Sequence, residues 1–259
     1  MGYFNADFIQ FFIELAANNH KDWFDMNRVR YEQAVKKPFA NFTQTFINHL
    51  ALKHPVFKDL LAKDCIFRIN RDIRFSKDKT PYKLMCSAVV SPEGKKSTAI
   101  HGIYFELSPE HVRVYGGVYE IDKHDLMDLR EGLAANLPEF QKLIANPEFV
   151  EFFGEIHGDK NKMLPSNLRG AAEQEALIFN KQFYFYATFS PDLILQDELL
   201  DTLLKAYEIG KPLELFFNQF RQMFTGTMLA FDDCIEIAPH NSLKQIIFFD
   251  AEPTESCSG

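Results

Sequence analysis

Residues 99–118 read AIHGIYFELSPEHVRVYGGV, and this stretch decides the class of fold. Apolar and polar side chains nearly alternate on either side of Ser108–Glu110, a pattern typical of two strands divided by a turn. A connection this short joins antiparallel strands, because parallel neighbours need a crossover of a dozen or more residues. We therefore predict antiparallel strands at Ala99–Leu107 and Val112–Val118.

The same near-alternating pattern extends upstream of this pair. It predicts strands at Cys65–Phe75 and Lys83–Val90, with turns at Ser76–Pro81 and Ser91–Ser97. All the connections are too short to hold a crossover helix, so we predict an antiparallel β-meander.

Helical periodicity flanks the predicted sheet on both sides. Before it, Asn5 and Pro38 are typical first residues of two helices, and Trp23–Val35 forms another between them. After it, Asp122 is a good N-cap, and helices also follow in the sequence up to about Phe224. A further strand is predicted at Lys181–Phe189, and short helices at Pro138 and Pro147. The expected fold is α+β, an antiparallel meander packed with helices from both ends of the chain.

The predicted organisation is one α+β domain at residues 4–224. Residues 225–250 form a C-terminal extension packed on it, with β-like runs at Cys234–Ile237 and Gln245–Phe249. Residues 251–259 are polar and are expected to be a disordered tail.

Composition limits the classes of function. The chain has 259 residues, 27 of them phenylalanine, and a net charge of −8, which argues against general nucleic-acid binding. No apolar run approaches the length of a membrane span, and the N-terminus lacks a secretory signal, so a cytoplasmic protein is expected. The four cysteines form no C-x-x-C pair and the histidines no metal-binding spacing. No cofactor and no metal site is predicted, and no G-x-S-x-G or paired Cys/His motif indicates a nucleophilic enzyme.

One segment has an unusual local charge. Residues 67–83, FRINRDIRFSKDKTPYK, hold six cations and two anions, a local charge of +4 within an acidic chain. We call this the basic segment. If it is extended, Arg68, Asp72 and Arg74 share one face and Arg71 lies on the apolar face. Arg71 is then expected to be the most buried arginine of the segment and to have a carboxylate or carbonyl partner.

The polar face of the segment is the predicted ligand site. Guanidinium groups bind carboxylates and phosphates bidentately, and Arg68 and Arg74 flank Asp72. Lys79 follows in the mobile loop, and Tyr82 offers a polar tip at a turn. A carboxylate between two arginines should have a lowered pKa, which suits a structural clamp better than a proton shuttle near neutral pH.

The motif R-x-x-R-D-x-R-F followed by K-x-x-Y resembles that of a known family, the bacterial conserved hypothetical proteins called domain of unknown function 2461. The matching residues are Arg68, Arg71, Asp72, Arg74, Phe75, Lys79 and Tyr82. The resemblance covers roughly residues 4 to 222 and implies membership without a mechanism. The chain departs from the family at Pro165–Leu168, which lacks the usual glycine and aromatic residue, and in the stretch after Thr225.

Two functional interpretations remain open. In the first, the basic segment binds, or the protein acts on, a phosphorylated or carboxylated ligand, through Arg68, Asp72, Arg74, Lys79 and Tyr82. In the second, the protein is a non-catalytic interaction or structural protein, and the Arg–Asp network only stabilises the fold. A solvated charged face is the simplest alternative for the segment. Gly116-Gly117 lacks a complete phosphate-binding signature and is interpreted as a bulge or tight turn at a strand end. Arg130 is expected to be exposed.

Overall fold

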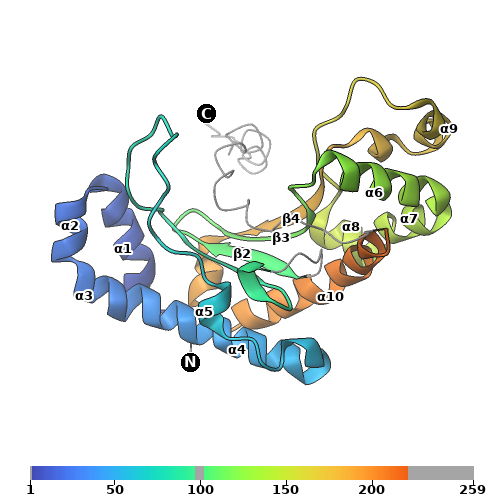
Figure 1. Ribbon diagram of the computed structural model, residues 1–259. Helices are drawn as coiled ribbons and strands as arrows, with labels where there is room; N and C mark the ends of the chain where they lie inside the picture. Colours follow the sequence, from blue (N-terminus) through green and yellow to red (C-terminus); the bar gives the residue numbers. More distant parts are fainter. Residues whose placement is uncertain (1, 97–101, 221–259) are drawn as a thin grey trace, which may run out of the picture.

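The computed structural model describes residues 2–96 and 102–220 of the chain. At its centre lies a four-stranded antiparallel sheet in the order β1-β2-β3-β4 (Figure 1). The predicted α+β class and antiparallel meander are confirmed, and a strand from much later in the chain completes the sheet. The strands are β1 Cys86–Val90, β2 Ile103–Leu107, β3 Val112–Val118 and β4 Phe183–Phe189.

The strand predicted at Cys65–Phe75 is wrong. Within this stretch, Ile66 and Asn70 make isolated bridges to Ala88 and Tyr82, and no continuous strand forms. The physical reason is local competition from a side chain. The carboxylate of Asp72 accepts the N–H of Arg74, two residues on, and so turns the chain away from a straight ladder.

The helices at the N-terminus follow the prediction except at Pro38, where the predicted third helix continues without a break from the helical turns before it. Asn5 caps the first of them by accepting the N–H of Asp7 at 3.0 Å, and the last ends at His54, before Pro55. The middle helix is broken at Asn27 and continues as a π-helical turn. The elements are α1 Ala6–Ala17, α2 Lys21–Met26, α3 Arg28–Arg30, η1 Tyr31–Lys36 and α4 Lys37–Lys53.

The remaining helices lie before, between and after the strands. Asp122 caps α6, as predicted, by accepting the N–H groups of His124 and Asp125. Pro138 and Pro147 lie in the first turns of α7 and α8. The α-helices are α5 Ala62–Cys65, α6 Lys123–Ala135, α7 Leu137–Ile144, α8 Pro147–Phe153, α9 Ser166–Gln174 and α10 Leu199–Asn218. Short 3-10 turns are η2 Pro55–Phe57, η3 Gly94–Lys96, η4 Ala176–Phe179 and η5 Pro191–Leu195.

One face of the sheet carries the phenylalanine-rich core. The Phe105 ring lies 5.8 to 6.0 Å from three rings of α4, and the Phe185 ring lies 5.0 and 4.7 Å from two rings of α8. In Figure 1, α4 and α10 pass beneath this face. The partners are Phe39, Phe42 and Phe46 on α4, and Phe149 and Phe153 on α8.

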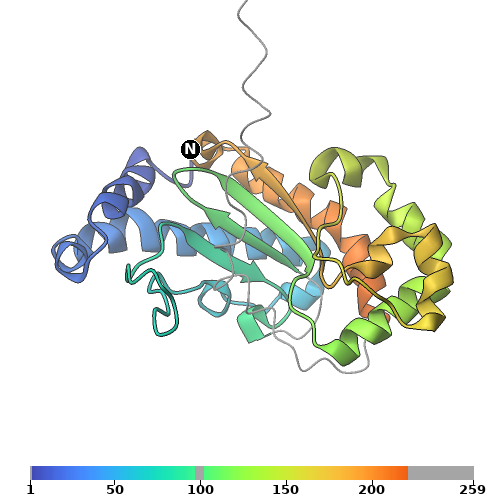
Figure 2. The ribbon, with the colours of Figure 1, turned by 90° about the horizontal axis from the view of Figure 1, so that it is seen from above.

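The opposite face of the sheet carries a different set of side chains. Val89, Tyr104 and Tyr115 form a separate buried cluster, and Tyr184 and Tyr186 pack against it. Figure 2 looks onto the sheet from this side, with α4 and α10 behind it. We call this surface the tyrosine face.

A buried carboxylate joins α10 to the end of the β2–β3 ladder. Glu214 accepts the backbone N–H groups of Gly102 and Gly117, each at 3.0 Å. A Cβ on Gly116 would meet Glu214 Oε1 at 2.6 Å, and Gly117 has a positive φ of 85°. The glycine pair therefore lies within β3 and makes room for a carboxylate from the protein itself, in place of the turn or bulge predicted at the strand end.

Three other expectations concern membrane spans, the cysteines and the C-terminal residues. No helix in residues 2–96 or 102–220 is long and apolar enough to span a membrane. Cys65 and Cys86 are buried free thiols, as expected. The predicted extension at 225–250, its two β-like runs and the tail at 251–259 lie outside the described residues.

Candidate functional site

The basic segment forms an irregular double-back beside β1. Phe67 N–H donates to Ser87 O at 3.0 Å, which places the start of the segment along β1. Arg71 N–H then donates to Pro81 O, and Lys83 N–H donates to Ile69 O. The two arms of the segment are thus tied to each other at its base. In Figure 1 this part of the chain rises beside the sheet, on the side of the tyrosine face.

Arg71 is held inside the double-back. Its side chain is 20 % exposed, against 75 % for that of Arg74, and Arg68 is exposed as well. The guanidinium donates to the carboxylate of Asp78 and to the hydroxyl of Thr80. The N–H of Thr80, followed by Arg71, lowers the pKa of Asp78 to about 2. Arg71 is thus the most buried arginine of the segment and has a carboxylate partner, as predicted.

Arg74 and Asp72 form an exposed bidentate ion pair. Nε lies 2.9 Å from Oδ1 and Nη2 lies 2.6 Å from Oδ2. Hydrogen bonds from the side chain and backbone of Arg74, with a smaller contribution from the charge of Arg68, lower the pKa of Asp72 to about 2. Asp72 is therefore ionised near neutral pH but only weakly basic, which suits a clamp better than a general base.

Three further cations stand on the segment. Arg68, Lys77 and Lys79 are exposed, and within residues 2–96 and 102–220 none of them forms an ion pair. Lys79 Nζ donates to the carbonyl of Ile73 at 2.8 Å, which places it next to Asp72 and Arg74. The structure thus brings four of the predicted site residues together, namely Arg68, Asp72, Arg74 and Lys79.

Tyr82 is placed elsewhere. Its ring is buried and stacks on Phe24 of α2, with centroids 4.1 Å apart and an interplanar angle of 16°. Its backbone N–H and carbonyl both pair with the side-chain amide of Asn19. Burial raises the pKa of its hydroxyl. Tyr82 thus anchors the base of the segment to the N-terminal helices.

Sequence reasoning missed the tyrosine face, which crosses all four strands in two rows. Paired positions in register form a mainly aromatic row, Val89–Tyr104–Tyr115–Tyr186, in which Val89 is aliphatic, and a polar row, Ser87–Glu106–Arg113–Thr188. Phe67, at the start of the basic segment, extends the aromatic row, because its ring lies 6.1 Å from that of Tyr104. The signal was present in Phe183-Tyr184-Phe185-Tyr186, where phenylalanine and tyrosine alternate and so face opposite sides of the sheet.

A buried polar group lies in the middle of this face. Glu106 is fully buried and accepts from His111 Nε2 at 2.8 Å and from the Tyr104 hydroxyl at 3.2 Å. Arg113 Nη1 lies 3.7 Å from Glu106 Oε1 and donates to the Tyr115 hydroxyl at 3.1 Å. The carboxylate is therefore surrounded by donors, which is the condition for holding a charge at this depth.

The prediction for Arg130 is wrong. We predicted an exposed arginine on α6, but its side chain is buried, and Nη2 donates to the carbonyls of Phe179 at 3.2 Å and Asn180 at 2.7 Å. Burial lowers its pKa. Arg130 fixes the chain that enters β4, which is a structural role that the pattern of α6 alone did not reveal.

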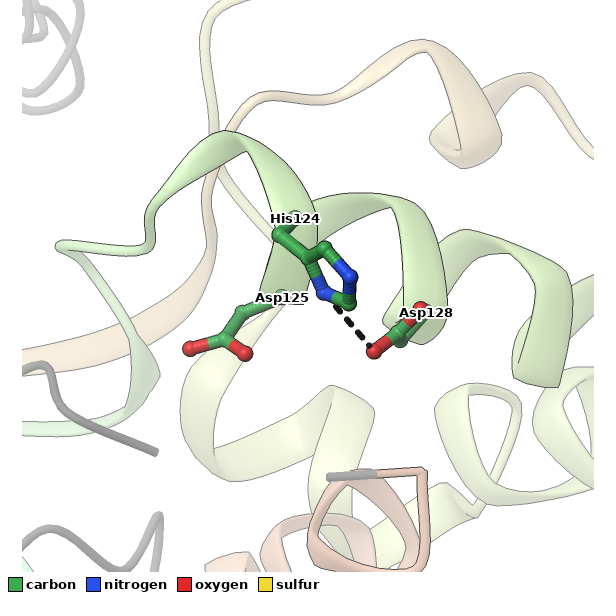
Figure 3. A group of neighbouring side chains, drawn as sticks. All are labelled: His124, Asp125 and Asp128. Carbon is green, nitrogen blue, oxygen red and sulfur yellow. Dashed lines mark ion pairs between the residues drawn. The ribbon is translucent and has the colours of Figure 1, made fainter. Parts of the chain in front are cut away.

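A group of side chains on α6 has the composition of a metal site. His124 Nδ1 lies 3.2 Å from a carboxylate oxygen of Asp128, one helical turn away, and Asp125 lies beside them (Figure 3). The imidazole is highly exposed. Calcium takes about six to eight oxygen ligands, and this group offers two carboxylates and one imidazole nitrogen. We assign the His124–Asp128 contact to an ordinary ion pair at a helix start.

Comparison with protein families identifies the chain. A family described as conserved hypothetical protein, domain of unknown function 2461, matches residues 7–216. The chain belongs to this family. Neither the search of curated proteins nor the search of solved structures found a match. The matched range contains the basic segment and the whole sheet, and it ends within α10.

Proposed function

We propose that this protein binds a phosphorylated or carboxylated ligand at the basic segment, with Arg68, Arg74 and Lys79 as the binding cations. The observation that carries the proposal is the charge balance of the segment. Its two carboxylates engage Arg71 and Arg74, and three exposed cations stand beside them without a carboxylate partner in the described residues. An oxyanion supplies the missing charge.

The ion pair between Asp72 and Arg74 supports the proposal. A guanidinium that already holds a carboxylate in two parallel hydrogen bonds has the geometry for a ligand carboxylate or phosphate. Arg68 lies near enough to lower the pKa of Asp72, and Lys79 is tied to the carbonyl between Asp72 and Arg74. A ligand oxyanion would displace Asp72 or bind beside it, and would meet all three cations.

The competing candidate is a structural network without a ligand. It is favoured by Arg71, whose bonds to Asp78 and Thr80 join the two arms of the segment and serve no ligand. In that case the segment stabilises the fold, and the protein acts through another surface. The two candidates differ in the role of Arg68. A ligand site uses its charge, whereas in a structural network this exposed side chain contributes little to stability.

Thermal unfolding in phosphate tests the proposal. A ligand that binds only the native state raises the melting temperature by mass action. Sulfate and phosphate also stabilise proteins generally, so wild type is compared with variants at equal concentrations of salt. Arg68→Ala should lose the increment, while Arg169→Ala, which removes an exposed arginine on α9, should keep it. Equal increments in all three proteins would rule out the site.

A further inference from the structure

The tyrosine face has a group of near-parallel aromatic rings along β4. Tyr184 and Tyr186 point to the same side of the strand, and their rings are inclined by 21° at 6.4 Å. His157 forms a bridge with Tyr184, and its ring lies 5.7 Å from Tyr184 and 4.8 Å from Tyr186, at 33° and 35°. Three half-buried, near-parallel rings thus pack against one another, and an aromatic ring can pack on their exposed sides in an edge-to-face or offset arrangement.

A rigid cation lies at one side of these rings. The guanidinium carbon of Arg113 is 6.0 Å from the centroid of Tyr186. Nε donates to Thr188 Oγ1 and Nη1 donates to the Tyr115 hydroxyl, each at 3.1 Å. Arg113 is thereby fixed on two sides before any ligand arrives, which lowers the entropic cost of binding.

Arg113 retains donors for a ligand. A guanidinium carries five N–H groups, and two are used by Thr188 and Tyr115. Within residues 2–96 and 102–220, Nη2 makes no hydrogen bond. Glu106 lies at 3.7 Å but accepts from His111 and Tyr104, so its charge is shared among several donors. The side chain of Arg113 is 19 % exposed, which leaves the guanidinium within reach of a small molecule.

We propose that this part of the tyrosine face is a second binding site, for a planar aromatic anion. The ring of the ligand lies against Tyr184, Tyr186 and His157, and its carboxylate or phosphate accepts from Arg113. A purely apolar ligand would leave Arg113 unused, and a bare anion would leave the rings unused. The site uses none of the residues of the basic segment, so this proposal is independent of the proposed function and can be tested separately.

Paired probes test the site by calorimetric titration of the full chain. Benzoate is compared with cyclohexanecarboxylate, and adenosine monophosphate with ribose 5-phosphate. Each pair has the same anionic group, and only the first member has an aromatic ring. Aromatic stacking adds about 0.5–1.5 kcal/mol, so the aromatic member should bind up to about tenfold more tightly in at least one pair. The pair that responds distinguishes an aromatic carboxylate from a nucleoside phosphate as the ligand.

Variants separate binding from folding. Tyr186→Leu should lose the preference for the aromatic member, while Tyr186→Phe keeps the ring and should retain it. Because the basic segment is also proposed to bind anions, Arg113→Gln is combined with Arg68→Ala, and the double variant should bind neither member of a pair. Arg68→Ala alone should leave this site unchanged while affecting the proposed anion site. If Arg113→Gln does not fold, the two Tyr186 variants still decide. Equal binding of aromatic and non-aromatic members in wild type, or full retention of the preference in Tyr186→Leu, would overturn the proposal.

Discussion

Arg74 donates two hydrogen bonds to the carboxylate of Asp72, with Nε 2.9 Å from one oxygen and Nη2 2.6 Å from the other. The pair is exposed to solvent, lies two residues apart on a turn, and is surrounded by further cations. An exposed ion pair of this kind contributes little to stability. Under the proposed function, Asp72 acts as an internal anion that holds Arg74 in the geometry a ligand would use.

Removal of that internal anion should strengthen ligand binding. We expect Asp72→Asn to bind phosphate several-fold more tightly than wild type, because the asparagine no longer competes for Arg74 or offsets the charge of Arg68. Isothermal titration at constant ionic strength measures the change. Weaker binding in Asp72→Asn would mean that Asp72 positions the cations and does not compete with the ligand.

The two arginines of the segment should differ in their effect on stability. Arg71 is largely buried between Asp78 and Thr80, whereas Arg74 is largely exposed. Arg71→Ala should therefore lower the urea midpoint clearly, since it leaves partners unsatisfied, while Arg74→Ala should leave the midpoint nearly unchanged. The reverse order would contradict the arrangement of side chains described here.

Glu214 should make the stability of the protein depend on pH. Burial raises its pKa from 4.5 to about 8, despite two N–H donors that lower it. The native state therefore binds more protons than the unfolded state between these values, so stability falls as pH rises from about 5 to 8. The effect is on the order of a few kcal/mol. Denaturation in urea at several pH values should show a free energy of unfolding that depends less on pH in Glu214→Gln than in wild type. The same pH dependence in both proteins would contradict this role of Glu214.

Two glycine substitutions should have opposite effects on stability. A Cβ at Gly117 would lie 2.3 Å from the carbonyl oxygen of Phe183, at a positive φ, so Gly117→Ala should destabilise by at least about 1–3 kcal/mol. A Cβ at Gly170, within α9, meets nothing within 4 Å. Gly170→Ala should stabilise by about 0.5–1 kcal/mol. Thermal unfolding of both variants tests the pair, and a gain in Gly117→Ala would be inconsistent with the close approach of β3 and β4.

The fold could largely be predicted from the sequence because its signals are local. Asn5 and Asp122 cap helices where capping residues are expected, and the alternation at 112–118 forms β3. The stretch at 65–75 failed because its alternating apolar residues favour a strand, while the carboxylate of Asp72 binds a nearby backbone N–H. Such short-range competition is hard to weigh from periodicity alone.

The candidate sites were harder to predict because they depend on long-range contacts. Tyr82 has a polar tip and follows a turn, yet its ring is buried by Phe24 from the N-terminal helices. Tyr104, Tyr115 and Tyr186 line up only when the register of three strands is known. The placement of tyrosine and phenylalanine on opposite faces was visible in β2 and β4, but its meaning required the assembled sheet.

Arginine side-chain resonances give the most direct test of the anion site. In a titration with phosphate, followed by proton–nitrogen correlation spectra of the Nε–H groups, the signals of Arg68 and Arg74 should shift and saturate with one common Kd. The signal of Arg169 should remain in place, and an equal ionic strength of chloride should reproduce none of these shifts. If Arg68 and Arg74 respond to phosphate no more than Arg169 does, the basic segment is a structural network and not a binding site.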